Sequence, residues 1–379
     1  MSDRHCDIGG IHLLVHPPDG EMAVRERAGQ WLAEQGLIEQ VEFAGTRDAA
    51  GRPVLALRLA PDYAEQWTPQ ADTLGLCERA ELDTQRSDAD LEREITVAML
   101  AGPCPFAYPS VDELSSSIRI RRNIVQAARR TALAFDTRGV ERPPDCWAYD
   151  DERGFTIIPG CSLITALTKA TQPEVSGTLY PFSCYRATEY VTLLGIAQEL
   201  ADSNPELLAR LQRQFEMRAI KSGQFHDVFL REYGSMEAPL PMRYFVPGDR
   251  TWFRNPDQAS SDAEGYEGSW VFYLGGGLFS NFWKRDKPFT LTSKCVEVFH
   301  WRHGLYTDAD GDARIDEQIV EAHVRDSMND PAALERILPL MMRPREPKGV
   351  YRDGGCIDTT REYPRWIRKP TSDMALPDA

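Results

Sequence analysis

Residues 177–201 read GTLYPFSCYRATEYVTLLGIAQELA, a short extended stretch around Pro181 followed by a long helical pattern. Cys184 stands where the extended stretch ends and the helix begins. Backbone N–H groups at the start of a helix stabilise a thiolate, and they can also stabilise the oxyanion formed on an attacked carbonyl. Cys184 is therefore the best candidate for a nucleophile, although a cysteine at such a position is more often structural.

Helical periodicity and β-rich runs surround this segment. Helices are followed by a meander of short strands, which predicts an α+β fold. The arginines of the first long helix share its polar face, so we expect them in solvent; they are Arg119, Arg121, Arg122, Arg129 and Arg130. Helices are predicted at 112–132, 162–170, 184–201 and 205–217, and strands at 251–253, 270–274, 278–283 and 289–291.

The first hundred residues differ in character from the rest. They hold 19 Asp and Glu against nine Arg, and they read as strand, helix, strand and strand at 11–16, 22–37, 41–43 and 54–59. A breaker cluster, AGPCP, follows at 101–105, and the chain ends in a segment rich in Pro, Arg and Asp. We predict an acidic α+β accessory domain (1–104), a core (105–345) and a poorly ordered C-terminal tail (346–379).

Composition excludes several classes of protein. The net charge of −15 disfavours binding to nucleic acid or to an anionic membrane. The eight cysteines are too sparse for a disulfide scaffold and form no zinc-type pair, so most are expected to be reduced and buried, with no metal bound. No apolar run is long enough to span a membrane, and the N-terminus has no signal-peptide core. We expect a cytoplasmic protein, with non-classical export left open.

Three stretches, in matching order and spacing, resemble a known family. They are 110–114 with 121–128, then 177–184, then PGD at 247–249 with WFRNPD at 252–257 and the run 268–275. Together they resemble the small bacterial protein-glutamine gamma-glutamyltransferases (transglutaminases) of the endospore-coat type, and residues 177–184 lie where that family has its Tyr-x-Phe-x-Cys nucleophile motif. The resemblance covers about residues 105–305.

This resemblance implies a circularly permuted papain-like core of the NlpC type and a two-step acyl transfer. Cys184 would form a thioester with a substrate glutamine, and a lysine amine would then attack that thioester. The partners implied are a protein bearing the glutamine and an amine donor, and no cofactor is required. Two alternatives stay open: a glutamine deamidase or thiol amidase, effector- or toxin-like, and a catalytically degenerate descendant that only binds protein.

The chain departs from the family pattern where the base is expected. The family has a glutamate at the position of Ser269, another directly before the cysteine at the position of Ser183, and usually a histidine near Asn281 or Phe282. A hydroxyl group does not act as a base near neutral pH. These departures are the reason for keeping the binding-only alternative.

Glu267 is the nearest substitute for the missing base. It precedes Ser269 by two residues, and a shift of two keeps a side chain on the same face of a strand. Glu264 is a poorer choice because it is further away, and the sequence does not locate three further candidate bases, His226, His300 and His303. Two more residues match the family pattern, Asp249 and Asn255, and we interpret both as architectural.

Two other features call for an interpretation. Residues Asp308–Asp316 resemble an EF-hand calcium loop, but Ala313 replaces the glycine and Ile319 the final glutamate, so an acidic turn before a helix is favoured. The chain has seven lysines against 36 arginines, and none before Lys169. Codon usage explains this bias, although an enzyme that crosslinks through lysine amines would also benefit from having few of its own.

Overall fold

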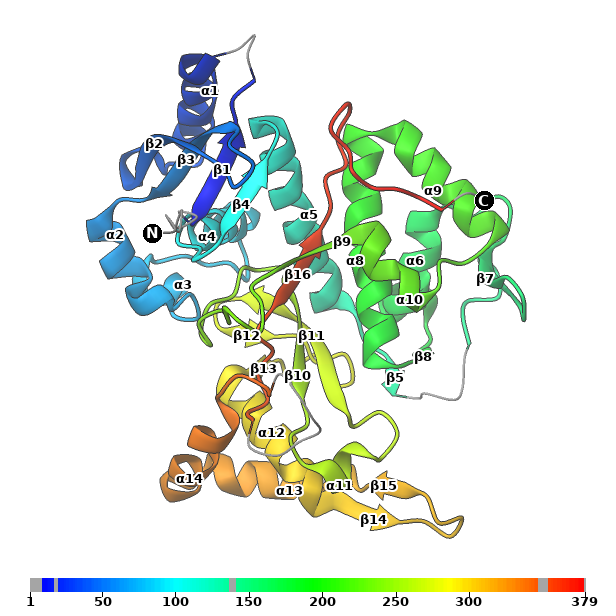
Figure 1. The fold of residues 1–379 in the computed structure, drawn as a ribbon. Helices are drawn as coiled ribbons and strands as arrows, with labels where there is room; N and C mark the ends of the chain where they lie inside the picture. The colour runs from blue at the N-terminus through cyan, green and yellow to red at the C-terminus, as the bar shows by residue number, and fades with distance from the viewer. Residues whose placement is uncertain (1–8, 17–19, 136–140, 347–353, 378–379) are drawn as a thin grey trace.

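The computed structural model describes residues 9–16, 20–135, 141–346 and 354–377. An N-terminal sheet with its helices lies on one side of a central sheet, and a group of helices built around α8 lies on the other (Figure 1). Three further helices, α12 to α14, extend from one end of the central sheet. The molecule therefore mixes helices and sheets, as predicted.

The N-terminal β-α-β-β unit is confirmed. It consists of β1 (Gly10–Leu14), α1 (Gly20–Glu34), β2 (Val41–Arg47) and β3 (Pro53–Leu59). The sheet has the order β2-β3-β1-β4, and its last strand, β4 (Pro105–Tyr108), runs parallel to β1. This sheet thus takes a strand from beyond the predicted boundary at 104. Three helices connect β3 to β4: α2 (Pro61–Trp67), α3 (Leu76–Arg79) and α4 (Asp88–Leu100).

The N-terminal sheet and the rest of the chain share one hydrophobic core. The Tyr244 hydroxyl donates to the Ala98 carbonyl of α4 at 2.9 Å, and the Glu94 carboxylate accepts the N–H of Gly276 at 2.9 Å. Gly276 and its two glycine neighbours all have positive φ, a conformation that residues with a side chain rarely adopt. Helix α4 is therefore packed against the end of a central strand, while the predicted domain boundaries themselves stay a prediction.

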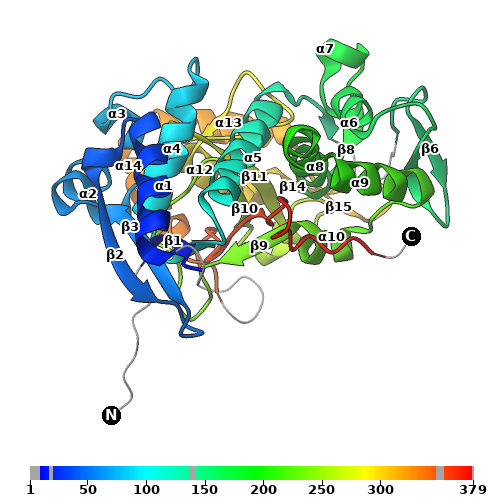
Figure 2. The same ribbon diagram turned by 90° about the horizontal axis from the view of Figure 1, so that it is seen from above.

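The predicted helices of the core are confirmed. They are α5 (Val111–Arg130), α6 (Leu163–Thr171), α8 (Cys184–Ser203) and α9 (Pro205–Met217), with α7 (Pro173–Ser176) and α10 (Ser222–Phe229) in addition. Figure 2 shows α5 alongside α8. Gly195 makes this close approach possible, because a Cβ at that position would come within 2.6 Å of the Ile124 side chain.

The expectation that the α5 arginines are solvated is wrong for Arg121. Its side chain is fully buried and pairs with the equally buried Asp249 at 2.8 Å. The Asp249 carboxylate also accepts the Val246 N–H at 2.7 Å and the Tyr233 hydroxyl. Asp249 is thus architectural, as interpreted. Helical periodicity alone does not reveal a buried ion pair whose partner lies 128 residues away in sequence.

The central sheet has six strands in the order β13-β12-β11-β10-β16-β9. Strand β16 (Arg361–Pro364) pairs with β10 and β9, and its Arg361 is fully buried. The expectation of a poorly ordered tail after 346 therefore fails for residues 354–377, which complete the sheet. The other strands are β9 (Leu230–Tyr233), β10 (Arg250–Arg254), β11 (Gly268–Gly275), β12 (Leu278–Phe279) and β13 (Phe289–Thr290).

The segment considered for calcium is a hairpin turn that leads into a helix cap. Asp308 closes the turn between β14 (Leu305–Thr307) and β15 (Ala313–Ile315), and its carboxylate also receives Arg314 Nε at 2.8 Å. Asp316 caps α13 (Glu317–Met328). These contacts correspond to the favoured acidic turn. Helices α11 (Gln258–Ser261) and α12 (Leu291–Gly304) contact β15, and α14 (Pro331–Met341) packs against α12 and α13.

Two cysteines form a disulfide, whereas the other five in the described residues are free thiols, as expected for most of them, and two of these five are buried. Cys146 and Cys161 join the two ends of the hairpin formed by β6 (Trp147–Asp150) and β7 (Gly154–Ile157). Disulfides are rare in a reducing cytosol, so this pairing bears on the cytoplasmic location, which stays a prediction. Among the described residues, no helix is both long and apolar enough to cross a membrane.

Candidate active site

Cys184 is the first residue of α8, as the sequence predicts. The two residues of β8 (Pro181–Phe182) pair in parallel with β5 (Ala134–Phe135), which fixes the direction from which the chain enters the helix. Ser183 is the N-cap, and its hydroxyl accepts the N–H of Arg186 at 3.3 Å. The serine that replaces the expected glutamate at 183 therefore has a structural role at the helix start.

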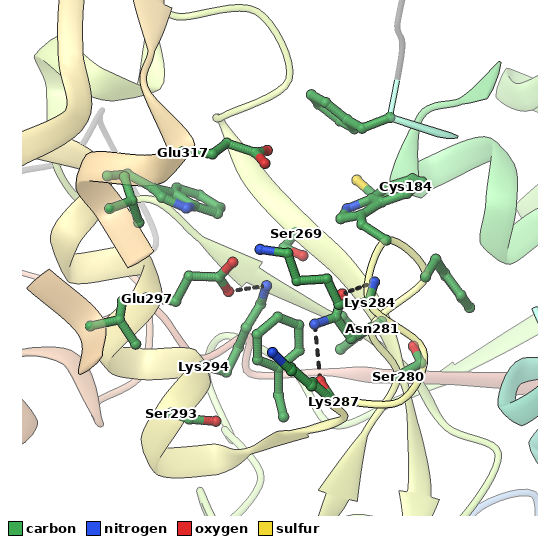
Figure 3. Close-up of a pocket in the computed structure, with 18 of the residues that line it drawn as sticks. Cys184, Ser269, Ser280, Asn281, Lys284, Lys287, Ser293, Lys294, Glu297 and Glu317 are labelled. Carbon is green, nitrogen blue, oxygen red and sulfur yellow. Dashed lines mark hydrogen bonds and ion pairs between the residues drawn. The ribbon is translucent and has the colours of Figure 1, made fainter. Parts of the chain in front are cut away.

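Cys184 lies in the wall of a pocket of about 520 Å³. We call this cavity the Cys184 pocket. Figure 3 shows Cys184 on one side, Glu297 and Lys294 of α12 on the other, and Ser269 of β11 between them. Residues 265, 266, 268–271, 280–284 and 287–289, together with residues of α13, line most of the rest. The cavity therefore lies between the helix that carries the thiol and the α12–α13 pair.

Opposing influences act on the Cys184 thiol. Burial raises its pKa above the ordinary value, because a thiolate loses its hydration there. Hydrogen bonds from the backbone N–H groups of Trp270 and Tyr185, together with the positive charges of Lys294 and Arg250, act in the opposite direction. Burial is the larger effect, so the thiol is protonated at neutral pH in the absence of a substrate.

Arg250 supports both groups that flank the thiol. Its guanidinium lies 3.8 Å from the centroid of the Trp270 ring and 4.5 Å from that of Tyr185. It donates to Thr188 Oγ1 at 2.8 Å and pairs with Glu362. Arg250 was not predicted as a site residue, because its partner Glu362 belongs to the segment that was predicted to be a poorly ordered tail.

His226, one of the candidate bases, is held by the same carboxylate. Its Nδ1 lies 3.0 Å from the Glu362 carboxylate, and that hydrogen bond raises the pKa of His226. His226 does not line the Cys184 pocket. It therefore belongs to a chain of polar contacts behind Arg250 rather than to the cavity.

Ser269 and Asn281 stand where the family has its glutamate and usually its histidine, and the structure locates both. Ser269 lines the Cys184 pocket on β11. Asn281 lines it too, but its side chain is engaged within its own loop: the amide donates to the Lys287 carbonyl at 3.0 Å, and its oxygen accepts the Lys284 N–H at 3.1 Å. Both contacts appear in Figure 3. Asn281 thus shapes the loop that carries two pocket lysines.

Glu267 and Cys184 are not brought together. Glu267 directly precedes β11, its side chain is exposed, and it is not among the pocket-lining residues. Glu264 is also exposed and lies 3.8 Å from Arg314. The assignment of Glu267 as base stays a prediction.

The wall of the pocket opposite the thiol is charged, which no sequence pattern indicated. Lys294 is almost completely buried and pairs with Glu297 at 2.7 Å, and its ammonium lies over the Phe289 ring. Lys284 pairs with Glu321 at the rim of the pocket. With Lys287, three of the seven lysines of the chain line this one cavity. This clustering does not fit the idea that lysines are scarce in order to keep amines away from the nucleophile.

The other two candidate bases, His300 and His303, lie on α12 but do not line the Cys184 pocket. Burial lowers the pKa of His300 to about 4, and it also lowers that of His303. Asn255 is fully buried, and its amide donates to Ser260 Oγ and to the Tyr266 carbonyl, both at 3.0 Å. Asn255 is therefore architectural, as interpreted.

A comparison with protein-family models connects this site to known proteins. The model for protein-glutamine gamma-glutamyltransferase matches residues 75–352, which include Cys184 and all the residues that line its pocket. The chain belongs to this transglutaminase family. The match begins inside the region that was predicted to be an accessory domain, so α4 and the loop before it belong to the family region as well.

Other comparisons add little to the transglutaminase assignment. Among solved structures, the chain is similar to a transglutaminase from Geobacillus stearothermophilus without its C-terminal extension, at 20% identity and a TM-score of 0.40. The similarity covers 56% of this chain and 98% of that one. A likeness of this size carries no argument about fold or residues. No curated protein matches the chain significantly.

Proposed function

We propose that the chain is a thiol acyltransferase that acts on glutamine side chains, with Cys184 as the nucleophile. The sulfur attacks the carboxamide carbon, the C–N bond breaks as a C–S bond forms, and the thiol proton leaves with ammonia. An amine then attacks the thioester, the C–S bond breaks, and a proton returns to the sulfur. The product is an isopeptide bond when the amine belongs to a lysine.

One observation carries this proposal: Cys184 lies at the start of a helix, in the wall of a pocket, with two backbone N–H groups directed at its sulfur. Such donors stabilise negative charge where it develops in acyl transfer. The order of a cysteine-bearing helix followed by antiparallel strands also fits a papain-like, NlpC-type core, which stays part of the proposal.

Two carboxylates compete for the role of base. Glu267 is the first candidate, on the strand-register argument, and it would have to turn inward from its exposed position. Glu297 is the second, because it lines the Cys184 pocket and pairs with Lys294, whose charge favours the thiolate. A general base has to come within hydrogen-bond reach of the proton that it removes.

The test uses a fluorescent primary amine and a protein substrate rich in exposed glutamine. We expect the amine to be incorporated by the natural chain and not by Cys184→Ala. Comparing Glu267→Gln with Glu297→Gln identifies the base, since loss of a general base costs about 10²- to 10⁴-fold in rate. Glu264→Gln is the matched control. Ammonia release without incorporation of the amine would indicate a deamidase instead.

A specific observation also favours a second candidate, a binding protein without catalytic activity. Within the part of the chain that the structure describes, no carboxylate or imidazole is hydrogen-bonded to the Cys184 sulfur, and burial raises the pKa of its thiol. Should the natural chain release no ammonia and incorporate no amine, while Cys184→Ala still binds glutamine-bearing peptides, this second function holds and the acyltransferase proposal fails.

A further inference from the structure

Three histidines from two helices meet on one side of the α12–α13 pair. His300 and His303 are three residues apart on α12, so they share a face of the helix, and His323 of α13 lies against them. One ring nitrogen from each lies within 4.8 Å of the other two. These are three of only seven histidines in the chain, and none of them lines the Cys184 pocket.

The rings are arranged so that their nitrogens converge. The Nδ1 atoms of His300 and His303 are 2.8 Å apart. The His323 ring is stacked on His300 with centroids 5.3 Å apart, and it lies 4.8 Å from His303. A proton shared between the two Nδ1 atoms would explain why His300 and His303 lie close together, but it would not explain the position of His323. An ion between the ring nitrogens would explain the positions of all three rings.

The buried member of the trio is oriented by a second contact. His300 is only 4% exposed, and its Nε2 lies 2.8 Å from Ser327 Oγ on α13. Histidines that bind metals usually donate their other ring N–H in this way, which fixes both the tautomer and the direction of the ligating nitrogen. His303 and His323 are exposed, so an ion and a water ligand can reach the cluster from solvent.

We propose that His300, His303 and His323 bind a divalent transition-metal ion of the zinc class, with solvent completing the coordination. Three imidazole nitrogens suit Zn²⁺, Cu²⁺ and Ni²⁺, whereas Mg²⁺ and Ca²⁺ require oxygen ligands. Three protein ligands with one open position is also a common coordination for zinc. This site is separate from the thiol chemistry and does not depend on it.

The position of the site gives the ion a mechanical role. Lys294 and Glu297 of α12 and Glu321 of α13 line the Cys184 pocket from another side of the same two helices. Helix α13 packs against α12 and α14, and Val320 and Ser327 are its buried residues. Helices α12 and α13 lie side by side (Figure 1), so an ion bound to both would hold this wall of the pocket in place.

The test titrates the full, untagged chain with Zn²⁺ by calorimetry and with Co²⁺ by visible absorption. We expect one ion per chain, with the absorption bands of a tetrahedral Co²⁺ site and an increase in melting temperature with Zn²⁺. His303→Ala and His323→Ala, which change exposed residues and leave the fold intact, should each weaken binding about tenfold or more. Ser327→Ala keeps all three ligands and should weaken binding by about 10- to 100-fold.

Two controls separate this site from other places where zinc binds. His16→Ala removes an exposed histidine that lies two residues after β1, and Cys184→Ala removes the pocket thiol. Neither should change the affinity. The proposal is overturned if the natural chain takes up neither ion, or if His303→Ala and His323→Ala bind as tightly as the natural chain and show the same increase in melting temperature.

Discussion

At the scale of single residues, the Cys184 thiol is governed more by burial than by the groups that favour its ionisation. Burial raises the pKa of Cys184 above its ordinary value of 9.0, so little thiolate is present at neutral pH. We predict that alkylation of Cys184 by iodoacetamide increases with pH, about tenfold per unit, and continues to increase beyond about pH 9. Mass spectrometry of the peptide that contains Cys184 measures this rate.

The unfolded chain is the matched control for this measurement. In urea, Cys184 has the pKa of an ordinary thiol, and its alkylation rate should level off near pH 9, about half a unit above the model-peptide value. A plateau below that pH in the folded protein would mean that the two backbone N–H groups outweigh burial. The Cys184 thiolate would then be the resting form, contrary to this prediction.

The buried pair of Arg121 and Asp249 leads to a second prediction at this scale. Both side chains are fully buried, and removing one partner leaves an uncompensated charge in the interior. Arg121→Met should therefore lower the free energy of unfolding by about 3–5 kcal/mol. Arg122→Met on the same helix is the control: it loses a partly exposed pair with Glu92, which is worth less than about 1 kcal/mol. Urea unfolding compares the two variants, and equal losses would contradict the argument.

At the scale of secondary-structure elements, the start of α8 depends on its cap. The Ser183 hydroxyl satisfies the N–H of Arg186, and β8 and β5 hold the residues just before it. Ser183→Ala should lower the free energy of unfolding by about 1 kcal/mol, whereas Ser183→Asp, which also caps helices well, should not. Chemical denaturation distinguishes them. If the two variants lose the same amount, the hydroxyl matters for a reason other than capping.

At the scale of the whole molecule, local patterns predicted the elements, but not the long-range pairings between them. The N-terminal unit and the helix that begins at Cys184 were predictable because periodicity and helix-start signals lie within each segment. Strand β16 was not, because its four residues form a strand only through pairing with β9, more than a hundred residues earlier. For the same reason the position of Cys184 at a helix start could be predicted from sequence, whereas the approach of Arg250 and Lys294 to it could not, since distant segments bring them together.

The contact between the N-terminal sheet and the core predicts how stability depends on pH. Burial raises the pKa of Glu94, whose carboxylate accepts the Gly276 N–H at the far end of β11 from the Cys184 pocket. The native state therefore keeps this proton to a higher pH than the unfolded chain does. The stability contributed by the protonated carboxyl is complete below the unfolded-state pKa, and it is lost as pH rises through the raised native pKa.

Glu94→Gln keeps an oxygen to accept from Gly276 and is neutral at every pH. We therefore predict that this variant gains stability over the natural chain as pH rises from about 5 to 8, by up to about 1.4 kcal/mol per pH unit until the native carboxyl ionises. Urea midpoints measured across that range test this, with Glu92→Gln, two residues earlier on α4, as the control. If the difference in free energy of unfolding between Glu94→Gln and the natural chain stays constant with pH, the prediction is wrong. The Glu94 carboxyl would then already be ionised where the N-terminal sheet meets the core.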